Sequence, residues 1–161
     1  MANHVQLRDV NEADLPIFYE QQLDIEASRM AALPSRGREA FMSHWIRILG
    51  NNSVLVKTIL FDGAVAGNIV CFDQLGEREV GYWLGKEYWG KGIATQALAE
   101  FLHYIETRPL YAHVAKHNIA SRRVLEKCGF KVSGEDSFFS QAFNKNIEEY
   151  ILILDTNGST N

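Results

Sequence analysis

The sequence lacks the features that mark several classes of protein. Its 161 residues include only two cysteines, too few for a disulfide-stabilised secreted domain, so we expect Cys71 and Cys128 to be reduced thiols in a cytoplasmic protein. The longest apolar run, residues 150–154, is far shorter than the roughly 18–20 residues that span a bilayer. No N-terminal signal peptide is visible, and we expect no association with a membrane. No CxxC or HExxH spacing occurs and the five histidines are scattered, so no metal site is expected.

The overall charge gives little reason to expect binding to nucleic acid. The formal net charge is −4, whereas nucleic-acid-binding domains are commonly basic. Residues 86–131, however, contain eight basic and four acidic side chains, so the middle of the chain is locally positive. Such a segment indicates a local anionic ligand, although a chance fluctuation of solvated charges would look the same.

The length and the residue patterns predict one domain of mixed secondary structure. At roughly 100–200 residues per domain, we expect residues 1–155 to form a single domain and residues 156–161 a polar tail. Apolar residues that alternate or cluster in short runs predict strands at 5–8, 53–61, 64–72, 79–84, 110–115, 130–139 and 147–154. Apolar residues that recur with a period of 3.6 predict helices at 14–23, 35–49, 92–107 and 118–128.

The order of these elements predicts an α/β (α+β) fold with a mixed sheet. Asp62-Gly63 lies between two strand-like runs and is a strong signal for a tight hairpin. The strand–helix–strand unit at 79–115 requires a parallel strand pair with a right-handed crossover. The sheet is therefore expected to be mostly antiparallel, with one parallel pair near its middle and helices beside it.

The segment 79–95 is the one that indicates chemistry, because a strand leads through a glycine-containing loop into an amphipathic helix. The first amides of a helix have no partner within it, and together with the helix dipole they form an anion site. Gly90 and Gly92 remove side chains at this point, and Lys91 adds a cation. A phosphate or diphosphate is the natural ligand, whereas a helix entry without any ligand is the alternative. A Walker A loop would need Ser or Thr where Gly92 stands, and the GxGxxG dinucleotide-binding motif is absent.

This segment and the one that follows resemble the GNAT N-acetyltransferases. Trp89-Gly-Lys-Gly-Ile-Ala94 is similar to the acyl-CoA loop of that family, Arg/Gln-x-x-Gly-x-Gly/Ala, and departs from it at Trp89. The strings GYWLGKEYWGKGIATQAL and AHVAKHNIASRRVLEKCGF resemble the branch that acetylates the N-terminal amines of ribosomal proteins. The resemblance covers residues 79–130 strongly and the two ends of the chain more loosely.

The resemblance implies a GNAT acyl-CoA N-acyltransferase fold whose central parallel strands splay apart, and acetyl-CoA as the cosubstrate. Pantetheine would pair with the strand at Trp83 and Leu84, and the amides of residues 90–95 would hold the diphosphate. Candidates for the 3′-phosphate are Lys86, Lys116, Arg122 and Arg123, although for any single one of them the more common role is that of a solvated surface cation. The residues expected to bind acetyl-CoA are Trp83, Leu84, Trp89, Gly90, Lys91, Gly92, Ile93, Ala94, Thr95, Asn118, Ser121 and Arg122.

The same resemblance suggests catalytic residues. Many relatives have a general-acid tyrosine where this chain has Leu125, and Ser121 or a water is the substitute we expect to bond to the departing sulfur. Asn118 and Ser121 could also serve only the start of their helix. Glu79 is the candidate general base, with pairing to Arg78 or to a neighbouring strand as the alternative.

Three further side chains have more than one possible role. His113 and His117 could relay a proton or be structural. Cys128 precedes a helix-ending glycine and is expected to be a buried hydrophobe, which disfavours a covalent acetyl-cysteine route.

The expected function is transfer of acetyl from acetyl-CoA to a primary amine, by direct attack in a ternary complex. A peptide or protein N-terminal α-amine is the expected acceptor, with small-molecule amines as an alternative. A non-catalytic acyl-CoA-binding module and a nucleotide-dependent enzyme are further alternatives. Acceptor specificity is expected from the loops at 24–38 and 138–146, and the protein is expected to be a monomer or homodimer.

Overall fold

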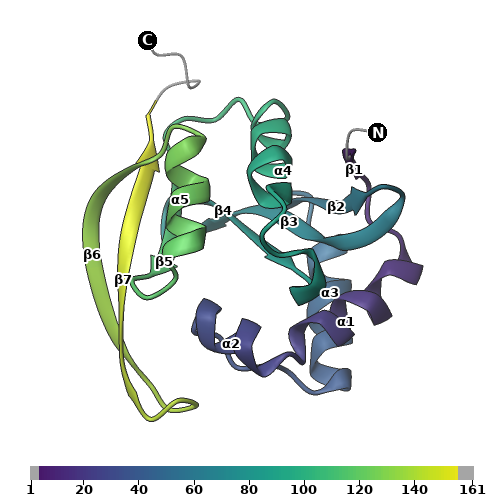
Figure 1. The fold of residues 1–161 in the computed structure, drawn as a ribbon, viewed down its shortest axis with the longest axis horizontal. Coiled ribbons are helices and arrows are strands. Elements are labelled where there is room, and N and C mark those ends of the chain that lie inside the picture. The colour runs from purple at the N-terminus through teal and green to yellow at the C-terminus, as the bar shows by residue number, and fades with distance from the viewer. Residues whose placement is uncertain (1–3, 156–161) are drawn as a thin grey trace.

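The computed structural model describes residues 4–155, which form one sheet and helices on both of its faces (Figure 1). The strands are β1 (Val5–Arg8), β2 (Leu55–Phe61), β3 (Ala64–Gln74), β4 (Glu77–Leu84), β5 (Leu110–Ala115), β6 (Lys131–Ser140) and β7 (Lys145–Leu154). The α-helices are α1 (Leu15–Gln22), α2 (Ile25–Ala31), α3 (Arg38–Leu49), α4 (Ile93–Leu102) and α5 (Ile119–Lys127). Two short 3₁₀ turns, η1 (Glu12–Asp14) and η2 (Lys86–Tyr88), precede α1 and α4.

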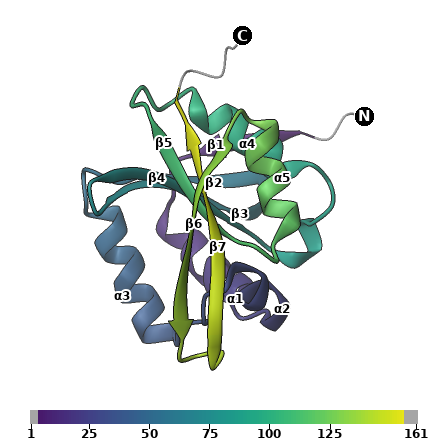
Figure 2. The ribbon, with the colours of Figure 1, turned by 90° about the vertical axis from the view of Figure 1, so that its left-hand side faces the viewer.

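Within residues 4–155 the seven strands lie in the order β1-β2-β3-β4-β5-β7-β6, and only β4 and β5 run parallel. The mixed sheet with one parallel pair in its middle is therefore confirmed. Asp62 and Gly63 both have positive φ, at 50° and 85°, as the expected tight turn between β2 and β3 requires. The sheet begins with β1 at one edge and ends with the β6–β7 hairpin at the other, and this hairpin faces the viewer in Figure 2.

Two hydrophobic cores hold the helices against the sheet. On one face, α4 and α5 cover a core that includes the fully buried side chains of Ile69, Leu98 and Phe101. On the other face, Phe18 of α1 and Trp45 of α3 pack together and against strand residues. Their rings lie 5.0 Å apart between centroids. The sheet is thus supported from both sides at β2–β4, which fixes the position of β4.

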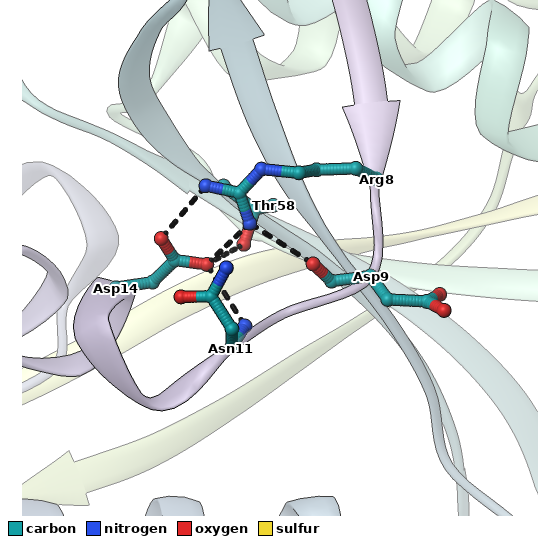
Figure 3. A network of polar contacts seen from close by, with 5 residues as sticks. All are labelled: Arg8, Asp9, Asn11, Asp14 and Thr58. Carbon is teal, nitrogen blue, oxygen red and sulfur yellow. Dashed lines mark hydrogen bonds and ion pairs between the residues drawn. The ribbon is translucent and has the colours of Figure 1, made fainter.

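A buried polar network joins β1, β2 and the turn before α1 (Figure 3). The Arg8 guanidinium donates to both carboxylate oxygens of Asp14, at 2.7 and 2.9 Å, and Thr58 Oγ1 donates to the same carboxylate at 2.7 Å. The backbone N–H of Asn11 donates a fourth hydrogen bond to Asp14 Oδ2, at 3.0 Å. Desolvation alone would raise the pKa of Asp14, but these hydrogen bonds and the charge of Arg8 hold it below its usual value.

Three expectations about the elements were wrong. Residues 25–31 form the short helix α2, capped by the Asp24 carboxylate, which accepts from the Ala27 amide at 2.9 Å. A seven-residue helix offers too little periodicity to be separated from a loop. The helix expected to reach residue 107 ends at Leu102, where the chain tightens into i→i−3 hydrogen bonds, although Ile105 is still buried. Strand β6 continues to Ser140 and β7 already begins at Lys145, so the turn between them is shorter than expected.

No helix within residues 4–155 is long and apolar enough to cross a membrane. The polar tail expected at 156–161 lies outside the described residues.

Candidate active site

The site begins where β4 and β5 separate. These parallel strands share a single register pair, Glu79 with Tyr111, whereas β3 and β4 pair all the way from Gln74–Glu77 to Gly67–Leu84. Beyond Glu79, β4 continues for five residues to Leu84 without a partner on this side. Because the strands are parallel, both carboxyl ends diverge at the same edge, and backbone groups of β4 are left unpaired there. The splayed pair is thus confirmed.

A cavity of about 370 Å³ lies at this divergence. Ten of the twelve residues expected to bind acetyl-CoA line it; Lys91 and Arg122 do not. The other lining residues come from α2, β4, η2 and α5, and they are Ala27, Met30, Ala31, Tyr82, Tyr88, Ala120, Arg123, Val124 and Lys127. The contribution of α2 to the cavity wall was not expected, because the sequence analysis interpreted this segment as a loop.

One end of the cavity is formed by the start of α4. Gly90 and Gly92 have φ values of 76° and 78°, in the left-handed region that disfavours side chains. Nothing lies within 4 Å of where a Cβ would stand at either position, so a side chain there would project into open space. The first intrahelical acceptor is the carbonyl of Gly92, which leaves the amides of Ile93, Ala94 and Thr95 without helical partners. Such amides suit an anion.

The basic side chains around the cavity divide into two groups. Arg123 and Lys127 stand one turn apart on α5 and line the cavity. Three other candidates for a phosphate contact are engaged by carboxylates: Lys86 with Glu26, Lys116 with Glu135 and Glu148, and Arg122 with Glu126. Lys127 was missed by sequence reasoning, although its i, i+4 spacing from Arg123 on one helix was a usable signal.

Two hydroxyl groups meet in the cavity wall. Tyr82 of β4 and Ser121 of α5 share a hydrogen bond of 2.9 Å between their oxygens. Burial raises the pKa of Tyr82 to about 12, so its phenol stays protonated at neutral pH. Asn118 caps α5 by accepting from the Ser121 amide at 3.2 Å, as expected. Tyr82 was missed because its partner lies on an element far along the chain.

Glu79 stands at the position where β4 pairs with β5, and it does not line the cavity. Its side chain is only 9% exposed and lies 3.4 Å from Nε2 of His113 on β5. The alternative partner, Arg78, instead pairs with Asp73 and donates to the carbonyl of Ser53. Desolvation raises the pKa of Glu79, and the charge of His113 partly opposes the shift.

Glu77, Glu79 and His113 offer side-chain atoms within 4.8 Å of one another. Both imidazole nitrogens face carboxylates, because Nδ1 lies 2.8 Å from Glu149 and Nε2 faces Glu79. Carboxylates on both sides of the ring favour the protonated imidazole and raise the pKa of His113.

The remaining candidates have structural surroundings. His117 Nε2 donates to the carbonyl of Arg29 at 2.7 Å, which ties the β5–α5 loop to α2. Cys128 is half-buried, its Sγ lies 3.6 Å from the carbonyl of Thr95, and burial raises its thiol pKa. A raised pKa disfavours the nucleophilic thiolate, in line with the expectation for this residue.

Comparisons with known proteins agree on one family. A model described as an acetyltransferase (GNAT) domain matches residues 4–131. The Bacillus subtilis protein named "Putative ribosomal N-acetyltransferase YdaF" is 30% identical over 125 residues, which cover 72% of this chain and 68% of that protein.

Solved structures share the fold. A GNAT-family acetyltransferase from Bacillus anthracis has a TM-score of 0.79 at 20% identity, over 94% of each chain. Spermidine N-acetyltransferase from Vibrio cholerae, in complex with CoA and spermine, has a TM-score of 0.77 at 16% identity, over 93% of this chain and 95% of that one.

Proposed function

The chain belongs to the GNAT acetyltransferase family, whose members are acetyl-CoA-dependent acyltransferases, and on that premise we propose that its acceptor is the N-terminal α-amine of a peptide or protein. The divergence of β4 and β5 into a cavity that reaches the start of α4 supports acetyl-CoA binding, and the likeness to a relative named as a ribosomal N-acetyltransferase supports the acceptor. The cavity supplies unpaired backbone on one side and unpaired helix amides at its end.

The residues present fit acetyl-CoA, which supplies an activated acetyl thioester. The open space above Gly90 and Gly92 would admit a diphosphate against the free amides of α4. Arg123 and Lys127 would balance phosphate charge from the α5 side. The edge of β4 at Trp83 and Leu84, which does not pair with β5, would pair with the pantetheine amides as an added strand does. The Leu84 carbonyl already accepts from Trp89 Nε1 at 3.2 Å, so a pantetheine amide would share or displace that bond.

Glu79 would act on the attacking amine and Ser121 on the leaving sulfur. Glu79 would accept a proton from the attacking amine through water, because its side chain does not line the cavity. The Ser121 hydroxyl would donate a hydrogen bond to the departing sulfur. Tyr82 would orient Ser121, because a phenol that donates to Ser121 Oγ leaves the serine hydrogen free to point into the cavity. Together, Tyr82 and Ser121 would take the place of the general-acid tyrosine that many relatives have where this chain has Leu125.

An α-amine suits this site better than a lysine side chain. Its pKa is about 7.7–8.0, against about 10.4 for lysine, so at neutral pH a far larger fraction of an α-amine is neutral and a weak carboxylate base suffices. The name of YdaF supports a ribosomal-protein acceptor. The spermine in the Vibrio cholerae complex instead supports a small polyamine as the rival acceptor.

Release of CoA thiol from acetyl-CoA tests the proposal with three matched acceptors: a peptide with a free N-terminus and no lysine, the same peptide with a blocked N-terminus and one internal lysine, and spermidine. We expect turnover with the first, and a product about 42 Da heavier, the mass difference when an acetyl group replaces a hydrogen. Faster turnover with spermidine than with either peptide would show that the acceptor is a small polyamine and would refute the peptide acceptor.

A non-catalytic acyl-CoA-binding module is the second candidate, because Leu125 stands where many relatives have their acid. Tight binding of acetyl-CoA without turnover on any amine of the panel would favour it.

A further inference from the structure

His113 lies at the centre of a network that reaches across three strands. Its Nδ1 is 2.8 Å from Oε1 of Glu149 on β7. Its Nε2 is 3.4 Å from Oε2 of Glu79 and 3.9 Å from Oε1 of Glu77, both on β4. About a quarter of the His113 side chain is exposed, whereas Glu79 and Glu149 are largely covered, at 9% and 17%. One imidazole thus holds three carboxylates together.

The contacts favour a positively charged imidazole. Desolvation lowers the pKa of His113, but the hydrogen bond to Glu149 and the charges of Glu79, Glu149 and Glu77 outweigh it and raise the pKa. The charged groups that act on Glu79 are His113, which favours its ionised form, and Glu77 and Glu149, which oppose it. Without His113, the nearly buried carboxylate of Glu79 would face the carboxylates of Glu77 and Glu149 and would lose the imidazolium charge that opposes them.

We propose that His113 is a positioning residue for acetyl transfer: Glu149 holds it in place, and it sets a positive charge beside Glu79 that keeps this carboxylate ionised. The proposal rests on the proposed role of Glu79 as the base. In each turnover Glu79 takes the proton that the amine loses and passes it to solvent, while His113 stays protonated. The imidazolium therefore acts through Glu79 and does not touch the reacting atoms.

The pH dependence of kcat/KM tests this role. An opposite charge within about 4–6 Å lowers a carboxyl pKa by about 1–3 units. Because His113 is partly exposed, we expect the acidic limb of the profile to move up by about one pH unit in His113→Gln, at the low end of that range. His113→Lys keeps a cation and should hold the limb near its wild-type position. His103→Gln, at the exposed end of α4, is the matched control and should leave the profile unchanged.

A purely structural role for His113 predicts a different result. The glutamine and lysine variants would then lose activity at all pH values to a similar extent, with the limb unmoved, and that result would overturn the proposal. Thermal melts of each variant show whether it is folded at the assay temperature.

Histidine titration by NMR tests the charge without any assay of acetyl transfer. The Cε1 proton of His113 should titrate above the free-histidine value of about 6.5 in the wild type. In Glu149→Gln the midpoint should fall by about one unit. A wild-type midpoint at or below that of free histidine would overturn the proposal and leave the proposed activity intact. Conversely, full activity of Glu79→Gln would refute the role of Glu79 as base, whatever the NMR result.

Discussion

Gly92→Glu is the sharpest perturbation of the proposed diphosphate site. Gly92 precedes the first residue of α4, lines the cavity and has open space where a Cβ would stand. Its φ of 78° is strained for any side chain, so the substitution also costs stability, about 1–2 kcal/mol. Gly63→Glu is a matched control, because Gly63 has a φ of 85°, equally open surroundings and a position in the β2–β3 turn.

The expected loss of CoA affinity follows from charge repulsion. Two unit charges about 4 Å apart repel by about 1 kcal/mol in water and about 4 kcal/mol near a protein surface. The cavity is open to solvent, so about 1–2 kcal/mol for each of two phosphate charges is the appropriate scale. A total of about 2–4 kcal/mol corresponds to a loss of roughly 30- to 700-fold in Kd.

Calorimetric titration with CoA measures this difference directly, and thermal melts report the backbone strain separately. We expect both variants to melt at similar temperatures, below the wild type, while only Gly92→Glu loses affinity. The weakening should diminish at high salt, since the effect is electrostatic. A folded Gly92→Glu protein that binds CoA as tightly as Gly63→Glu would refute the placement of the diphosphate at the start of α4.

Other perturbations test the hydroxyl pair and the buried ion pair. Ser121→Ala should lower kcat by about 10²-fold, and Tyr82→Phe by roughly tenfold, since general acid–base groups contribute about 10²–10⁴-fold. An unchanged kcat in Ser121→Ala would exclude this hydroxyl from the reaction. Asp14→Asn should lower the free energy of unfolding at pH 7 by about 2–3 kcal/mol, because Arg8 and Thr58 lose their carboxylate partner. The pKa of Asp14 is lowered in the folded state, so the wild-type advantage should persist above about pH 4 and disappear as the pH falls further. Urea unfolding of both proteins across this range measures it, and a constant difference down to pH 2 would contradict the reasoning.

Local patterns in the sequence were sufficient for most of the elements. The 3.6-residue period after Gly92 predicted α4, and burial of Ile93, Ala97, Leu98 and Phe101 confirms the face. Asn118 and the glycine that follows α5 correctly marked its ends. These signals depend on hydrogen bonds and side-chain periods within a few residues, so they do not require knowledge of the rest of the chain.

The expected cofactor site was also largely local. The glycine-containing loop and the start of α4 are consecutive in sequence, and most of the predicted residues line one cavity. The wall supplied by Ala27, Met30 and Ala31 was not foreseen, because α2 is short and meets the cavity only through tertiary packing.

Bonding and periodicity among near neighbours were enough to predict the strands, every α-helix except α2 and the glycine-lined helix start. The order of these elements then required the parallel crossover. The tertiary structure decided which side chains meet across that framework. Tyr82 reaches Ser121 from 39 residues away, and His113 reaches Glu149 from 36. Such pairs depend on strand order, register and helix docking, which bring distant residues to within a hydrogen bond and which no local pattern encodes.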